Sequence, residues 1–269
     1  MYLGFSLLIR ETDDIKDLFS KIKDAGFDGV EPTFHPQGIP SPENYRETAP
    51  KLTQIAKEVG LKIPSMRGGP LFWTTFSSDD SILRNEAVEL AKKAFECLKI
   101  MGGDTLLIVP GKWEGNILYS KVYNNALDTA ERISKIAEEY NITVGLENVE
   151  NKFLLSPLEW SQFIDKIKSP RIKVYLDIGN LVSLGLGYPD LWIRELGKER
   201  IARIHFKDAV ELKSTTYLLQ GDINWDNVMK AIREIGYEGW IIVELPLYKR
   251  YPELMIESTG KALRGITRI

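Results

Sequence analysis

Four ionisable side chains close four successive short apolar runs in the second half of the chain. These residues are Glu147, Asp177, His205 and Glu244. Three carboxylates in one pocket raise one another's pKa, so such a cluster needs a nearby cation. We therefore predict that these residue types bind one divalent metal ion through carboxylate oxygens and one imidazole nitrogen.

The predicted ligand set is rich in oxygen, which bears on the identity of the metal. It favours Mn²⁺ first, with Mg²⁺ or Co²⁺ as alternatives, and it leaves room for two oxygens from a substrate. Zinc is disfavoured, because it more often takes four ligands in a site rich in sulfur or nitrogen.

Each predicted ligand, taken alone, has a simpler interpretation. A single Asp or Glu at a strand end is more often a helix cap or an ion-pair partner, and a core histidine is more often only hydrogen-bonded. The recurrence of such residues in four successive runs favours ligation. The chain has two histidines. His35, in the loop after the second run, is left open between solvent exposure and a place at a substrate-binding mouth.

Eight short β-branched or apolar runs are predicted to be strands. They alternate with stretches in which apolar residues recur at spacings of three and four, which is typical of amphipathic helices. The predicted strands are Tyr2 to Leu8, Gly29 to Thr33, Lys62 to Met66, Thr105 to Val109, Thr143 to Asn148, Lys173 to Asp177, Ala202 to Phe206 and Trp240 to Leu245. The predicted helices include Asp13 to Ala25, Tyr45 to Val59, Ile82 to Met101, Val122 to Tyr140, Leu158 to Ile167 and Trp225 to Ile235.

This alternation predicts a single-domain α/β fold, a (β/α)8 TIM barrel spanning residues 1–269. Glycines after several of the predicted helices, such as Gly60 and Gly102, are expected to end those helices in a left-handed conformation. No Gly-x-Gly-x-x-Gly turn opens the first unit, which argues against a dinucleotide-binding fold. In a TIM barrel the active site lies at the carboxyl ends of the strands, where the four predicted ligands stand.

Composition excludes several classes of function. The chain has 269 residues and a formal net charge of -3, with no basic stripe of the kind that binds nucleic acid. No apolar run approaches the roughly 18 residues of a membrane span, and no secretory leader is evident at the N-terminus, so we expect a soluble, cytoplasmic protein. The single cysteine, Cys97, lies at helical spacing from apolar residues and is expected to be a buried structural thiol.

Four segments together resemble those of the xylose isomerase-like barrel superfamily, and the resemblance spans nearly the whole chain. They are Gly145 to Val149, Tyr175 to Asn180, Ile204 to Asp208 and Gly221 to Trp225. Within that superfamily the chain is most similar to the sugar-phosphate isomerase/epimerase group, which includes ketose 3-epimerases and L-ribulose-5-phosphate 3-epimerases. The resemblance implies that the four predicted ligands hold the metal, and that Glu147 and Glu244 also act as the acid/base pair.

The implied reaction also follows from chemistry. A ketose that chelates the metal through its C2 carbonyl and C3 hydroxyl oxygens has an acidified C3 proton, because the cation stabilises the enediolate. One glutamate removes the proton. The second can return a proton to C3 and invert its configuration, whereas return at C1 would yield an aldose.

Two positions depart from the pattern of the free-sugar epimerases. Those enzymes usually have a histidine at the position of Asn180 and an arginine at the position of Glu211. The difference favours an acyclic ketose, with a ketose phosphate as one option. We predict that Asn180 and Lys207 contact substrate oxygens, while an ion pair with a neighbouring carboxylate is the alternative for Lys207.

Three further residues are predicted to contact the substrate. Arg67 is flanked by glycines after the third strand, Trp113 could pack on the apolar face of a sugar, and Glu31 could accept a hydrogen bond from a hydroxyl. For Arg67 and Trp113, plain loop packing is the alternative.

The sequence leaves alternatives in function. A metal-dependent dehydratase acting on inosose or dehydroshikimate, and a catalytically silent sugar-binding barrel, remain open. The DNA-repair endonucleases of the superfamily are disfavoured, because their zinc sites use several histidines. The expected partner is a small ketose or ketose phosphate, with no nucleic acid and no membrane. Relatives of this kind are commonly dimers or tetramers, so a homo-dimer and a homo-tetramer both remain open.

Overall fold

The computed structural model describes residues 1–268, in which eight parallel strands form one sheet. The spatial order of the strands is β2, β1, β10, β7, β6, β5, β4, β3. Two isolated parallel bridges, Gly29 to Lys62 and Thr33 to Arg67, join the two ends of this order and close the barrel. The strands are β1 (Tyr2–Leu7), β2 (Gly29–Pro32), β3 (Ser65–Arg67), β4 (Thr105–Ile108), β5 (Thr143–Glu147), β6 (Ile172–Asp177), β7 (Ile201–Phe206) and β10 (Trp240–Glu244).

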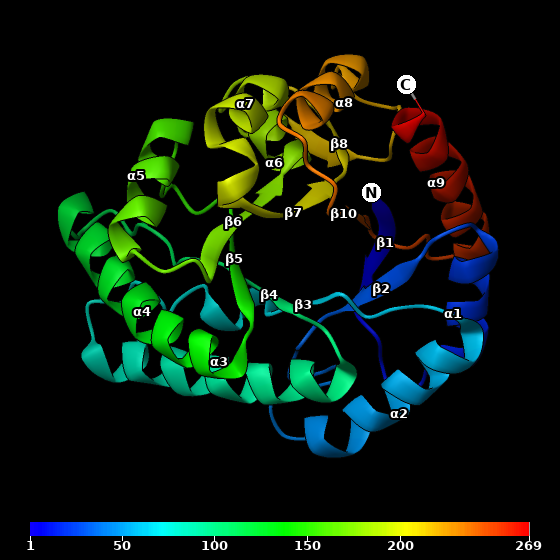
Figure 1. Cartoon of the computed structure of the whole chain (residues 1–269), viewed down its shortest axis with the longest axis horizontal. Coiled ribbons are helices and arrows are strands. Elements are labelled where there is room, and N and C mark those ends of the chain that lie inside the picture. The colour runs from blue at the N-terminus through cyan, green and yellow to red at the C-terminus, as the bar shows by residue number, and fades with distance from the viewer. Residues whose placement is uncertain (269) are drawn as a thin grey trace.

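The helices surround this barrel, and the last helix packs beside the first (Figure 1). The helices are α1 (Ile15–Asp24), α2 (Tyr45–Val59), the 3-10 helix η1 (Gly69–Phe72), α3 (Ser81–Met101), α4 (Tyr119–Tyr140), α5 (Pro157–Ile167), α6 (Ile178–Ser183), α7 (Pro189–Arg200), α8 (Trp225–Glu234) and α9 (Pro252–Thr267). The predicted TIM barrel is therefore confirmed.

Alternation along the strands divides the buried side chains into two clusters. A large cluster between strands and helices contains Leu106, Ile241 and Val243, whereas their neighbours Leu107 and Ile242 belong to a separate small cluster with Tyr175 and Trp240. Successive strand residues point to opposite faces of a sheet, so the small cluster fills the inside of the barrel. The functional residues stand on this inner face.

Several predicted boundaries shift in the structure. The third strand begins at Ser65 instead of Lys62, because Pro64 has no N–H to donate to a ladder. Helix α7 was not among the helices predicted from the sequence. Its buried residues include Trp192 and Leu196, but Gly197 adopts a non-helical conformation and interrupts the pattern. Helix α9 and a short antiparallel hairpin, β8 (Asp208–Val210) with β9 (Ser214–Thr216), were also not predicted.

The predicted glycine punctuation is confirmed. Gly60 and Gly102 follow α2 and α3 with φ of 80° and 77°, the left-handed conformation that lets the chain turn into the next strand. Cys97 is buried on α3, as predicted. Among the described residues, no helix is long and apolar enough to cross a membrane.

One glycine makes room inside the barrel. A Cβ built on Gly145 of β5 would lie 2.7 Å from Cδ2 of Tyr175 on the neighbouring β6. We expect Gly145→Ala to destabilise the fold by about 1–3 kcal/mol, because both groups lie in a packed interior. Denaturant unfolding measures this change. Gly115→Ala is the matched control, since a Cβ at Gly115 meets nothing within 4 Å; equal stabilities of the two variants would contradict the packing argument.

Candidate metal centre

The four predicted ligands meet at the carboxyl end of the barrel. They stand on β5, β6, β7 and β10, which are consecutive in the sheet, and Asp177 pairs in register with His205. One potential ligand atom from each of the four residues lies within 4.8 Å of the corresponding atoms of the other three. The convergence predicted from strand ends is thus present in the structure.

Asp177 can serve both as a helix cap and as a metal ligand, the two roles that the sequence allowed for an aspartate at a strand end. Its Oδ1 accepts a hydrogen bond of 2.8 Å from the backbone N–H of Asn180 and so caps helix α6. Its Oδ2 is buried, makes no hydrogen bond of good geometry, and faces the other ligands. A strand-end aspartate can therefore cap a helix with one oxygen and offer the other to a cation.

Hydrogen bonds between side chains and the backbone fix the position of Asp177. The Asn148 side chain donates to the carbonyl of Asp177 at 2.9 Å and accepts from its N–H at 2.8 Å, which links the end of β5 to the end of β6. Asn180 donates from its side chain to the Asn148 carbonyl at 2.8 Å. Gly179 allows the segment that follows β7 to approach, because a Cβ there would lie 2.7 Å from the Lys207 carbonyl oxygen.

Two basic side chains compensate part of the negative charge. Lys207 Nζ lies 2.9 Å from Asp177 Oδ2 and 2.7 Å from Glu244 Oε2. Arg67 forms an ion pair with the other oxygen of Glu244. Burial raises the pKa of the Asp177 carboxyl, the charge of Lys207 opposes that rise, and Glu147 adds to it. A divalent cation would suit these carboxylates, so the donor set fits a metal ion.

The imidazole of His205 lies between two groups of carboxylates. Its Nδ1 is 3.2 Å from Glu147, 3.5 Å from Glu244 and 3.7 Å from Asp177, while its Nε2 is 2.8 Å from Glu31. Burial disfavours the charged ring, yet Glu31 and Glu147 together raise the pKa of His205 to about 9. Burial also opposes ionisation of Glu31, but His205 and two hydroxyls lower the pKa of Glu31 to about 2.

A cavity of about 390 Å³ opens above the ligands. Five of the nine predicted site residues line it together with His35, whereas Asp177, His205, Trp113 and Glu31 do not. Its lining consists of Leu8, Thr33, His35, Arg67, Gly69, Trp73, Leu107, Val109, Glu147, Val149, Glu150, Asn180, Lys207 and Glu244.

The two residues predicted only as substrate contacts that lie outside the cavity lining have other partners. The Trp113 indole donates to the Ile117 carbonyl at 2.8 Å and packs edge-on against Tyr119. The Glu31 carboxylate is fully buried beneath His205. Their substrate contacts, predicted from sequence, therefore have no counterpart in this cavity.

The structure also adds residues that sequence reasoning missed. Trp73 and Glu150 line the cavity from loops, where no periodic pattern marks them. Ser65 and Tyr175 lie beneath the four predicted ligands and donate hydrogen bonds to Glu31. Tyr175 stands two residues before Asp177, so strand alternation could have placed both on the inner face.

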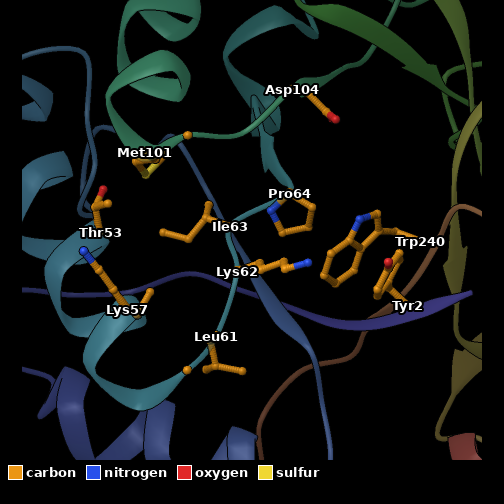
Figure 2. Close-up of a pocket in the computed structure, with 13 residues that line it drawn as sticks. Tyr2, Thr53, Lys57, Leu61, Lys62, Ile63, Pro64, Met101, Asp104 and Trp240 are labelled. Atoms are coloured by element: carbon orange, nitrogen blue, oxygen red, sulfur yellow. The ribbon is translucent and has the colours of Figure 1, made fainter.

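A second and larger cavity, of about 530 Å³, lies at the opposite end of the barrel. Figure 2 shows Lys62 extending toward Tyr2 and Trp240, which stand at the starts of β1 and β10. The two rings stack with centroids 5.1 Å apart, and Lys62 Nζ lies 5.0 Å from the Tyr2 ring. This cavity holds none of the four ligands. Because chemistry in TIM barrels takes place at the carboxyl ends of the strands, the smaller cavity is the candidate site.

The fold and the site together define a (β/α)8 barrel with a carboxylate-rich cluster that could hold a metal ion. The chain belongs to the xylose isomerase-like TIM barrel family, whose model matches residues 19–266. This result confirms the family resemblance found in the motifs.

Two curated relatives are similar over most of the chain. The uncharacterized protein MJ1311 of Methanocaldococcus jannaschii is 25% identical over 258 residues, which cover 91% of this chain and 83% of that protein. The putative L-ribulose-5-phosphate 3-epimerase SgbU of Escherichia coli is 24% identical over 200 residues, which cover 70% of this chain and 68% of that protein. The name of the second relative agrees with the predicted enzyme class, an isomerase.

Two solved structures share the fold along their whole length. A D-tagatose 3-epimerase-like protein has a TM-score of 0.82 at 21% identity, with 100% of this chain and 98% of that one covered. The IOLI protein, solved with a zinc atom, has a TM-score of 0.83 at 19% identity, with 99% and 98% covered. At these identities the two structures establish the fold alone.

Metal binding predicts a measurable gain in stability. After treatment with a chelator, addition of Mn²⁺ at 100 times its Kd should raise the free energy of unfolding by about 2.7 kcal/mol, because the ion binds only the folded chain. Asp177→Asn should lose most of this gain at the same Mn²⁺ concentration, since it removes a charged ligand. Thermal unfolding with and without Mn²⁺ measures both.

Asp104→Asn is the matched control for this measurement. Asp104 pairs with Arg203 and lines the cavity at the other end of the barrel. It should keep the full response to Mn²⁺. An unresponsive native protein, or an equal response in Asp177→Asn, would refute the metal assignment.

Proposed function

We propose that this chain is a metal-dependent carbohydrate isomerase that moves a proton on the carbon beside a ketose carbonyl, as a 3-epimerase or an aldose-ketose isomerase. The observation that carries the proposal is the position of Glu147 and Glu244. They stand on β5 and β10, at the two ends of the row of ligands, and both line the cavity. Two carboxylates on opposite flanks of a bound substrate can remove a proton from one face and return it to the other.

The proposed roles divide among the residues of the chain. One of the two glutamates takes the C3 proton to give an enediolate, and the other delivers a proton to the opposite face of C3 or to C1. A divalent ion held by the four ligands would supply electrostatic stabilisation for the negative charge on the substrate oxygens. We favour Mn²⁺, with Mg²⁺ or Co²⁺ as alternatives, on the chemistry of the ligands.

The cavity suits a small polyol ketose or its phosphate. Arg67, Lys207 and Asn180 offer hydrogen-bond donors beside the two glutamates. Trp73 and His35 offer ring faces and edges at the cavity wall, where an aromatic ring can pack on the apolar face of a sugar. Arg67 and Lys207 are also the two cations of the lining that could receive a phosphate. A cytoplasmic location and a dimeric or tetrameric assembly remain predictions from the sequence.

Solvent exchange tests the proposed proton transfer. With Mn²⁺ present, the protein should incorporate deuterium from D₂O at C3 of its substrate, found by screening ketoses, their 5- and 6-phosphates and inososes. Glu147→Gln and Glu244→Gln should each lower this exchange by about 100-fold or more, because each removes an acid/base group. Metal content of each variant is measured in parallel, since both residues are also ligands.

Glu114→Gln is the control, because Glu114 is an exposed loop residue paired with Lys112 and lies outside the cavity lining. It should keep full exchange. Undiminished exchange in both metal-loaded glutamine variants would eliminate the acid/base assignment. Formation of a conjugated enone from an inosose would instead indicate the dehydratase, and binding without exchange would indicate the sugar-binding barrel.

A further inference from the structure

A buried glutamate beneath the metal centre has no part in the proposed reaction. Glu31 on β2 has no exposed surface, and its carboxylate receives three polar contacts. Oε1 lies 2.8 Å from Nε2 of His205. Oε2 accepts hydrogen bonds from Ser65 Oγ, at 2.6 Å, and from the Tyr175 hydroxyl. Both carboxylate oxygens are therefore occupied within the barrel.

These contacts give the two nitrogens of His205 different tasks. An ionised carboxylate can only accept hydrogen bonds, so Nε2 must carry a proton to bond with Glu31. Nδ1 lies 3.2 Å from Glu147 and also faces Asp177 and Glu244, so a cation bound between these carboxylates would replace the Nδ1 proton and meet the lone pair of Nδ1, while Nε2 keeps its proton. A histidine that ligates a metal usually donates its second N–H to such a carboxylate.

We propose that Glu31 is a positioning residue for the metal centre. Glu31 holds His205 as the Nε2–H tautomer, so that Nδ1 points toward the ion. Tyr175 and Ser65 in turn hold Glu31 in position. The inference rests on the metal centre of the proposed function. It places Glu31 behind His205, whereas the sequence had suggested that Glu31 contacts the substrate.

The barrel places the parts of this support on four different strands. Glu31 comes from β2, Ser65 from β3, Tyr175 from β6 and His205 from β7. The Tyr175 ring packs against the His205 ring with centroids 4.5 Å apart, and Gly145 leaves the space that the Tyr175 ring fills. A group held from several strands has little freedom to rotate, so the imidazole stays fixed before the metal arrives.

Nitrogen NMR of the histidines tests the tautomer directly. The chain has only two histidines, so His35→Gln leaves the His205 ring as the single signal in protein labelled with ¹⁵N-histidine. With diamagnetic Zn²⁺ as the probe, Nε2 should carry a proton protected from solvent exchange, and Nδ1 should show the shift of a metal-bound nitrogen. A metal-bound Nε2, or a free Nδ1 in the loaded protein, would overturn the proposal.

Metal affinity tests the contribution of Glu31. Titration calorimetry with Mn²⁺ should show about 10- to 100-fold weaker binding for Glu31→Gln, which keeps the shape of the side chain and loses its charge. Tyr175→Phe should weaken binding less, because it keeps the ring beside His205 and removes one hydrogen bond to Glu31. Ile133→Val, which truncates a buried side chain of α4 itself, should lower stability and leave the Kd for Mn²⁺ unchanged.

The outcomes separate this inference from the proposed function. Unchanged affinity in Glu31→Gln would overturn the positioning role even if the native protein is an active isomerase. Absence of metal binding by the native protein would overturn both. Weaker binding and the expected tautomer would support the role of Glu31 even if no ketose shows deuterium exchange, because neither measurement needs a substrate.

Discussion

The mutual repulsion of three carboxylates at the barrel mouth is the constraint on which the rest of the site depends. Glu147, Asp177 and Glu244 lie close enough to share one ion, and two of them are in contact with basic side chains. Like charges at this distance, and in a mostly buried setting, need positive charge nearby. Lys207 and Arg67 supply part of it, and a divalent cation would supply the rest. The site is thus organised around a position for positive charge.

The inside of the barrel supports this arrangement in layers. The ligands and the two basic residues form the upper layer, and Glu31 with Tyr175 and Ser65 forms the layer beneath it. In most TIM barrels bulky apolar residues dominate such layers. Here a hydrogen-bonded layer lies under the ligands, and it restricts the histidine that would otherwise rotate. Burial without hydrogen bonds would be costly for each of these polar groups, so the layer forms as a unit.

The fold restricts the identity of the substrate less than it restricts the class of reaction. Families built on one barrel differ mainly in the loops at the carboxyl ends of the strands. In this chain those loops bring His35, Trp73 and Glu150 to the cavity, and none of them belongs to the ligand set. Under the proposed function, the residues that distinguish one ketose from another are expected in these loops, whereas the four predicted ligands and the residues beneath them would set the class of reaction.

The sequence by itself was enough to predict the barrel and the convergence of the four candidate ligands, because both follow from local patterns. Alternating strand and helix periods predict the architecture, and an ionisable residue at each of four successive strand ends predicts the ligand set. The glycines that end α2 and α3 could also be predicted, since the need for a left-handed residue at that position is local. The interrupted α7 was missed because Gly197 breaks the same local signal.

The tertiary structure alone decided which residues meet across the barrel. Glu31 and His205 are 174 positions apart in the chain, and no local pattern shows that one lies beneath the other. Lys207 proved to be both an ion-pair partner of Asp177 and part of the cavity wall, which its place after a strand could not settle. Trp113 and Trp73 follow neighbouring strands, yet only Trp73 lines the cavity, because the direction of a loop side chain depends on packing with distant segments.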